Sequence, residues 1–226
     1  MNTVQDEEEI SLRDLVYFPL FFNMVALVAT GLSFVFLPEL MLDYGQMMFM
    51  IYLSVFLAEL LLAYFLTRRL RNTDMSIRSL ITPKRRLRWL PATTVFIALN
   101  ALFIVYIGVA LWTGYVTSFT GLSSLQVIFF IVLAPLAAGF VEELAFRGYL
   151  IEIMLKKGLT ENRLVVYSAV SFALIHGFFI IDKLIMTFVF GLIAGFYYVR
   201  ERNLPVLIVS HVVVDVVTFG MSVYGF

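Results

Sequence analysis

The stretch that decides the fold of this chain covers residues 125–155 and reads LQVIFFIVLAPLAAGFVEELAFRGYLIEIML. A transmembrane helix needs about 20 mainly apolar residues, and this segment exceeds that length. Further apolar runs lie on both sides of it, at 15–37, 44–66, 90–113, 164–181, 184–199 and 206–224. The pattern predicts about seven membrane-spanning helices, and the short last three runs leave counts of six or eight open.

The composition agrees with a membrane protein. Of the 226 residues, 62% are hydrophobic and 14% are charged, whereas soluble domains carry about 25% charged residues. The 16 basic and 16 acidic side chains cancel, so no net field attracts nucleic acid. The chain has no cysteine and therefore no disulfide bond or thiolate zinc site. These features exclude a soluble enzyme and predict an all-α polytopic membrane protein.

Basic residues concentrate in the connections on one side of the seven-helix arrangement, above all in the loop 67–89. Every Lys and Arg except Arg147 and Lys183 falls on this side, which the positive-inside rule assigns to the cytoplasm. We therefore expect a cytoplasmic N-terminus and an outside C-terminus. We also expect a single domain with an acidic cytoplasmic tail at 1–14, N-terminal helices over 15–124 and a core over 125–226. A short chain without extra domains favours a prokaryotic cell membrane.

Several polar side chains lie inside the predicted spans, where charged groups cost free energy and mark functional sites. In the C-terminal half these are Glu142, Glu143, Arg147, His176, His211 and Asp215. Counted at 1.5 Å per residue, they reach overlapping depths in the cytoplasmic half or near the midplane. We therefore predict one polar site, buried between the C-terminal helices and opening toward the cytoplasmic half.

Some of these residues are spaced one helical turn apart, so the members of each pair share a helix face. Glu143 and Arg147 can form an ion pair, and Asp215 can orient or charge His211. A structural interpretation stays open for each: an ion pair that only locks its helix, or histidines that only hydrogen-bond between helices.

Other residues favour structural roles. Glu59 has no partner at helical spacing in its span, which favours a structural or water-facing role. Gly191 and Gly195 form a pattern suited to close helix packing. Ser171 and Ser210 could serve as nucleophiles beside a histidine, but membrane serines commonly bond to backbone carbonyls.

The polar set fits the activation of a water molecule for peptide hydrolysis. A buried carboxylate serves as a general base near neutral pH, and a histidine can share the water or donate to an oxyanion. The HExxH pair, the Gly-x-Gly-Asp loop and the Gly-x-Ser-Gly turn of other intramembrane proteases do not occur in the sequence.

A family resemblance rests on three motifs in this order: Glu142-Glu143-xxx-Arg147, Phe172-xxx-His176 and His211-xxx-Asp215. They resemble the motifs of the CAAX protease and bacteriocin-processing family, which includes the type II CAAX prenyl endopeptidases. The resemblance covers about residues 125–220 and implies an intramembrane endopeptidase.

The resemblance also implies roles for these residues. Glu142 would activate water with help from His176, and His211 and Asp215 would bind the oxyanion or the substrate carbonyl. Glu143, Arg147 and Phe172 would orient and line the site.

Asp215 departs from the family, which often has asparagine there. Because an ionised aspartate cannot donate a hydrogen bond, Asp215 is protonated, orients His211 or binds a metal. No cofactor is expected; the alternative is Zn²⁺ held by Glu142, His176, His211 and Asp215.

The expected partners are a membrane-associated peptide or protein substrate, prenylated or not, and membrane lipid. Two other classes of function stay open. A non-catalytic protein could use the same pocket to bind a peptide, as in bacteriocin immunity or regulation. The second class is a proton-coupled transporter, because acids and histidines in spans also form proton relays. The sequence shows none of the inverted repeats that are common in transporters.

Overall fold

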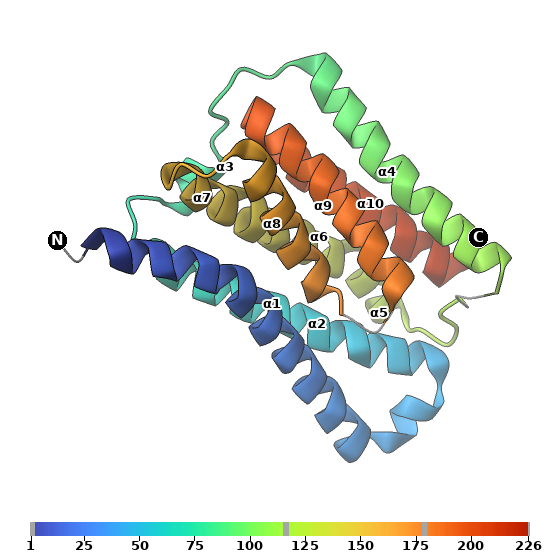
Figure 1. Ribbon diagram of the computed structural model, residues 1–226. Helices are drawn as coiled ribbons and strands as arrows, with labels where there is room; N and C mark the ends of the chain where they lie inside the picture. Colours follow the sequence, from blue (N-terminus) through green and yellow to red (C-terminus); the bar gives the residue numbers. More distant parts are fainter. Residues whose placement is uncertain (1–2, 115–117, 178–179, 226) are drawn as a thin grey trace.

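The computed structural model describes residues 3–114, 118–177 and 180–225, with side chains from Arg13 onward except that of Met41. Within these residues every regular element is a helix and no strand occurs (Figure 1). The all-α prediction is confirmed.

Six helical segments are long and apolar enough to cross a membrane. They are Arg13–Phe36 within α1 (Thr3–Phe36), α2 (Tyr44–Leu70), α4 (Trp89–Trp112), the continuous segment Ser124–Lys156, α9 (Ile181–Glu201) and α10 (Leu204–Tyr224). The segment Ser124–Lys156 contains α5 (Ser124–Ile128), η2 (Phe129–Leu133), α6 (Ala134–Glu143), η3 (Leu144–Ile151) and α7 (Glu152–Lys156), of which η2 and η3 are π-helical. The short helices η1 (Pro38–Leu42) and α3 (Ile77–Ile81) lie in the connections. The chain is thus an integral membrane protein.

The predicted span 164–181 differs from the structure. α8 (Glu161–Ile175) has 15 residues and is therefore about 22 Å long, short of the roughly 30 Å of a bilayer core. It ends before Gly177, whose φ of +90° is incompatible with a continuing helix. The apolar sequence runs on past this turn, so hydropathy alone extended the predicted span; residues 178–179 lie outside the described residues. The structure therefore has six candidate spans, within the predicted range, and a shorter helix at the fifth position.

The basic connections gather at one end of the bundle, as the loop assignment predicted. The backbone N–H of Lys84 donates to the carbonyl of Arg202 over 3.0 Å, which joins two of these connections. Glu152 accepts from Lys84 at 2.5 Å and from Arg202 at 2.7 Å, and Arg88 pairs with Glu201 at 3.1 Å. We call this end of the bundle the basic end.

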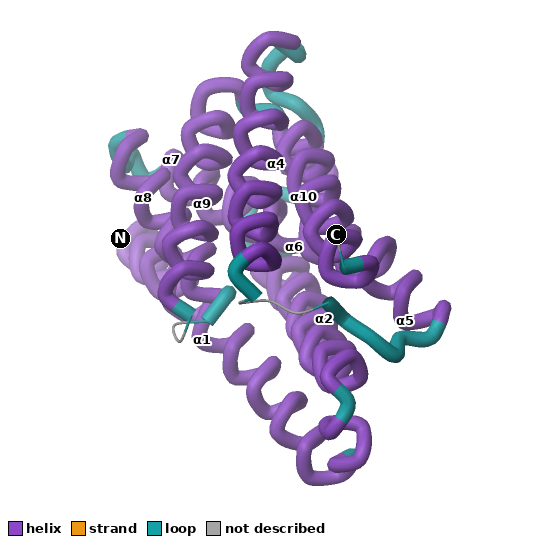
Figure 2. The backbone as a smooth tube through the Cα atoms, turned by 90° about the vertical axis from the view of Figure 1, so that its right-hand side faces the viewer, coloured by secondary structure: helices purple, strands orange, loops and turns teal. Residues whose placement is uncertain are grey.

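The C-terminal helices form the compact part of the bundle. α10 packs against α4 and α6, and α8 packs antiparallel to α9 (Figure 2). The last contact depends on small residues, as predicted: a Cβ added to Gly191 would lie 2.8 Å from the Cα of Ala169, and one added to Gly195 would lie 3.0 Å from Val165. α1 and α2 pair at the side of this core and contact α8 and α6 (Figure 1). The acidic segment predicted as a tail lies in the first turns of α1.

Candidate active site

The first motif lies where α6 passes into the π-helical segment η3. Glu142 and Glu143 are the last residues of α6, and Arg147 is in η3. The predicted ion pair is present: Nη1 of Arg147 donates to Oε1 of Glu143 over 2.8 Å, and both side chains are fully buried. Arg147 therefore carries a charge into the interior without contact with solvent.

His176 lies at the end of α8, where the turn at Gly177 places its ring beside α6. Its Nδ1 is 3.0 Å from the backbone carbonyl of Phe172. A carbonyl only accepts hydrogen bonds, so Nδ1 carries the proton and Nε2 of the neutral ring is an acceptor. This Nε2 lies 3.9 Å from Oε2 of Glu142.

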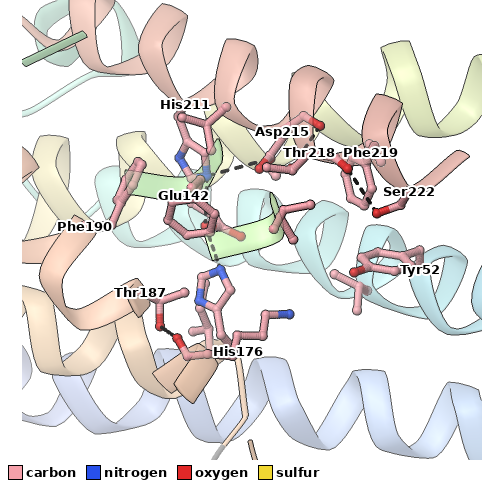
Figure 3. Close-up of a pocket in the computed structure, with 18 of the residues that line it drawn as sticks. Tyr52, Glu142, His176, Thr187, Phe190, His211, Asp215, Thr218, Phe219 and Ser222 are labelled. Atoms are coloured by element: carbon pink, nitrogen blue, oxygen red, sulfur yellow. Dashed lines mark hydrogen bonds and ion pairs between the residues drawn. The ribbon is translucent and has the colours of Figure 1, made fainter. Parts of the chain in front are cut away.

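His211 projects from α10 toward both glutamates. Its Nδ1 lies 2.9 Å from Oε1 of Glu143, and its Nε2 lies 3.8 Å from Oε2 of Glu142. Asp215, one turn further on, has its Oδ2 3.7 Å from the same Nε2, beyond hydrogen-bond distance. Glu142 thus lies between two imidazole rings from different helices, with Asp215 beside the second (Figure 3).

The ring of Phe172 contacts two of the site residues, Arg147 and His176. Its ring centroid is 4.1 Å from the guanidinium carbon of Arg147, a cation–π contact, and 4.9 Å from the centroid of His176. Phe190 of α9 stacks on it with centroids 5.5 Å apart and an interplanar angle of 16°. Phe190 also contacts the ring of His211 at 4.9 Å. One pair of stacked rings therefore contacts both histidines.

The structure brings all the predicted site residues together, although they come from three separate segments. The serines considered as nucleophiles are engaged elsewhere: Ser171 donates to the carbonyl of Leu15, and Ser210 to that of Val206. Among the described residues, no group of three or more His, Asp or Glu side chains is arranged to hold a metal ion.

A cavity of about 330 Å³ adjoins the site. Its polar part contains Glu142, the two histidines and Asp215, and aromatic side chains of α2, α4 and α10 line the rest. From Glu142 the cavity extends toward Tyr44, where α2 begins, and Ser222, near the end of α10. These residues lie at the end of the bundle remote from the basic end. We predicted that the site opens toward the basic end, but the cavity extends the opposite way. On the side of the basic end, the buried side chains of Phe146, Tyr149 and Tyr198 fill the interior.

The sequence motifs missed three residues of this region. Phe190 is the stacking partner described above. Lys183 of α9 lines the cavity and interacts electrostatically with His176 and Asp215. Glu59 of α2 also lines it and is almost completely buried. Charge inside a span was the one signal available for Glu59, since its neighbours in the cavity are distant in sequence.

With the geometry established, comparison with known proteins identifies part of the chain. Residues 123–217 match the family model described as Type II CAAX prenyl endopeptidase Rce1-like. These residues form an Rce1-like domain. The recognition from the three motifs is thus confirmed, and the Rce1-like domain contains every site residue predicted from the sequence. Its family implies an intramembrane endopeptidase. No curated protein and no solved structure matches the chain.

Proposed function

We propose that this protein is an intramembrane endopeptidase in which Glu142 activates the attacking water. One observation carries the proposal. Oε2 of Glu142 is buried, has no hydrogen-bond partner in the described part of the chain, and lies within 4 Å of Nε2 of both His176 and His211. Three polar atoms that face one another at this spacing leave room for a small polar molecule between them.

A water in this space would donate one hydrogen to Glu142 and the other to Nε2 of His176, both of which are acceptors. Its remaining lone pairs then point toward the cavity, where the substrate carbonyl would lie. As the water oxygen attacks the carbonyl carbon, its proton passes to Glu142, and the carbonyl oxygen becomes an oxyanion.

His211 supplies the complementary group. Its Nδ1–H bond to Glu143 fixes the ring, and Arg147 holds Glu143 in place. When the ring also carries a proton on Nε2, it donates to the developing oxyanion. The three carboxylates around the ring, Glu142, Glu143 and Asp215, stabilise this imidazolium form. In this arrangement Asp215 acts through His211 and needs no hydrogen of its own, which accounts for aspartate in place of the asparagine common in the family.

The proposed substrate is a peptide segment with a membrane-embedded or lipidated end. The aromatic part of the cavity offers an apolar surface for such an end, whether a prenyl group or hydrophobic side chains. We propose that no metal takes part, and that the basic end faces the cytoplasm of a prokaryotic cell.

The test is cleavage of quenched fluorogenic peptides, with and without a farnesylated cysteine, by purified protein in detergent. Wild type should cleave at least one of them, and Glu142→Gln should lower the rate at least about 100-fold. Glu161→Gln, at an exposed glutamate of α8, is the matched control and should keep wild-type activity. A folded Glu142→Gln protein that cleaves at the wild-type rate would refute the role of Glu142.

The same assay, repeated in the presence of metal chelators, tests whether cleavage requires a metal ion. Activity that persists in 1,10-phenanthroline and EDTA supports the metal-free mechanism. Activity that is lost and then restored by Zn²⁺ would instead make Glu142, His176, His211 and Asp215 candidate metal ligands.

A further inference from the structure

Glu59 is a buried carboxyl group that the mechanism above leaves unused. It lies in the middle of α2, outside the Rce1-like domain, and lines the same cavity as Glu142. Its side chain is 3% exposed, and its Oε2 has no hydrogen-bond partner within the described residues. A buried polar atom without a partner costs free energy in the folded protein. An apolar side chain would pack there at lower cost, so the acid calls for a functional explanation.

The charges around Glu59 differ from those around Glu142. Glu59 interacts electrostatically with Glu142 and Asp215, both of them acids. Over residues 13–114, 118–177 and 180–225, apart from position 41, no Lys, Arg or His forms an ion pair with it. The other titratable groups that line the cavity are Tyr44, Tyr52, Tyr106, Glu142, His176, Lys183, His211 and Asp215.

This difference separates the two glutamates by protonation state. Nε2 of His211 faces Oε2 of Glu142 at 3.8 Å, and the imidazolium form of His211 favours the carboxylate form of Glu142. Glu59 is buried, forms no ion pair within the described residues and shares the cavity with two other acids, Glu142 and Asp215. Burial and like charge both disfavour ionisation of a carboxyl group, so this environment favours the neutral acid. Two carboxyl groups in one cavity, one ionised and one protonated, are the arrangement that acid–base catalysis of hydrolysis requires.

We propose that Glu59 is the general acid that protonates the leaving amine. The inference rests on the proposed function. Water attacks the carbonyl carbon while Glu142 takes its proton. The O–H of Glu59 then gives its proton to the amide nitrogen as the C–N bond breaks, which releases a neutral amine and leaves Glu59 as a carboxylate. The proton on Glu142 returns to Glu59 through water in the cavity. One water is consumed, and one carboxylic acid and one amine are formed.

The experiment compares two substrates that differ only in the leaving group. The first is the fluorogenic peptide that wild type cleaves best. The second is its thiodepsipeptide analogue, in which a thioester replaces the scissile amide. The amine of the peptide leaves only after it gains a proton. The thiol of the thioester has a pKa of about 8.5, so it leaves as a thiolate without a proton from an acid. Glu59→Gln keeps the size and a hydrogen-bond donor but has no proton to give. It should lower kcat for the amide at least about 100-fold and that for the thioester less than about threefold.

Three further variants make the comparison decisive. Glu59→Asp retains an acid and should recover part of the amide activity that Glu59→Gln loses. Phe56→Leu reshapes the same cavity from the same helix and should change both rates in proportion. Glu142→Gln should lower both rates, since both reactions need the activated water.

The outcomes separate the two proposals. Equal losses on amide and thioester in Glu59→Gln, or no loss on either, would overturn the role of Glu59 and leave that of Glu142 intact. Unchanged rates in Glu142→Gln, or wild-type protein that cleaves neither substrate, would overturn the proposed function and the inference with it.

Discussion

The buried pair of Arg147 and Glu143 offers the sharpest test of how the site is held together. Replacing Arg147 by Met removes the guanidinium but keeps an unbranched side chain of similar length. Glu143 then stays fully buried, and within the described part of the chain its one remaining polar side-chain partner is His211. Because removal of one member leaves a buried charge without its counter-ion, Arg147→Met should be strongly destabilising.

The magnitude follows from the geometry. With charge centres about 4 Å apart and an effective dielectric constant of about 20, the attraction is about 4 kcal/mol. The cation–π contact with Phe172 adds about 1–2 kcal/mol, since the site is desolvated. Rearrangement around the carboxylate recovers part of this, so we expect a loss of about 3–5 kcal/mol in the free energy of unfolding.

The double variant Glu143→Gln/Arg147→Met separates stability from catalysis. It has no unpaired buried charge, and the Gln carbonyl can still accept from Nδ1 of His211. Its stability should therefore recover by at least about 2 kcal/mol relative to Arg147→Met. Its peptidase activity should not recover, because His211 has lost the neighbouring carboxylate that favours its imidazolium form.

The measurement is SDS-induced unfolding in mixed micelles, followed by circular dichroism, together with the peptide assay. A free energy of unfolding for Arg147→Met within about 1 kcal/mol of wild type would refute the reasoning, since it lies well below the range for a broken buried pair. A double variant no more stable than the single one would refute it as well.

Other predictions concern the contact between α8 and α9, the ring of Phe172 and the exposed pair of Asp74 and Lys156. Gly191→Ala places a Cβ 2.8 Å from a Cα of α8 and should lower the free energy of unfolding by about 1–3 kcal/mol. The control is Gly220→Ala, whose added Cβ has its nearest neighbour at 3.9 Å. It should change the free energy of unfolding by less than about 0.5 kcal/mol in the same assay. Phe172→Leu should lower kcat more than it changes KM, because it removes the aromatic ring that contacts the guanidinium of Arg147 and the ring of His176. The hydrogen bond from the Lys156 ammonium lowers the pKa of Asp74, so any stabilisation from this exposed pair is complete above the ordinary pKa and is lost as the pH falls through the lowered one. Because both side chains of the pair are exposed, it contributes little stability, so Asp74→Asn should leave the Tm at pH 7 unchanged within error; a large shift would contradict the placement of this pair on the surface.

Much of the fold was predictable because a bilayer requires long apolar helices. Six of the seven predicted runs coincide with helices that can span a membrane. The exception, at α8, arose because Phe178 and the residues after it are as apolar as a span, and hydropathy does not register that Gly177 ends the helix. The pair of Glu143 and Arg147 was predictable because both residues lie on one helix, one turn apart.

The residues missed from the sequence have partners only in three dimensions. Phe190 stacks on Phe172 across a helix interface, and no spacing within α9 marks it. Glu59 was identified as unusual, but its relation to Glu142 depends on how α2 packs beside α6. The direction of the cavity depends on which side chains fill each end of the bundle, so residue depths alone could not determine it.

The placement of Arg147 and Glu143 within one helix has a consequence for biosynthesis. The segment Ser124–Lys156 enters the bilayer as a unit, and each central charge raises its insertion free energy by about 2.5–3.5 kcal/mol. An ion pair formed one turn apart needs no other helix, so it can neutralise two of these charges while the nascent segment is still leaving the translocon. Partners from other helices, such as His211, reach Glu143 only after α10 has been synthesised. The intrahelical pair thus lowers the cost of insertion at a stage when the site itself does not yet exist.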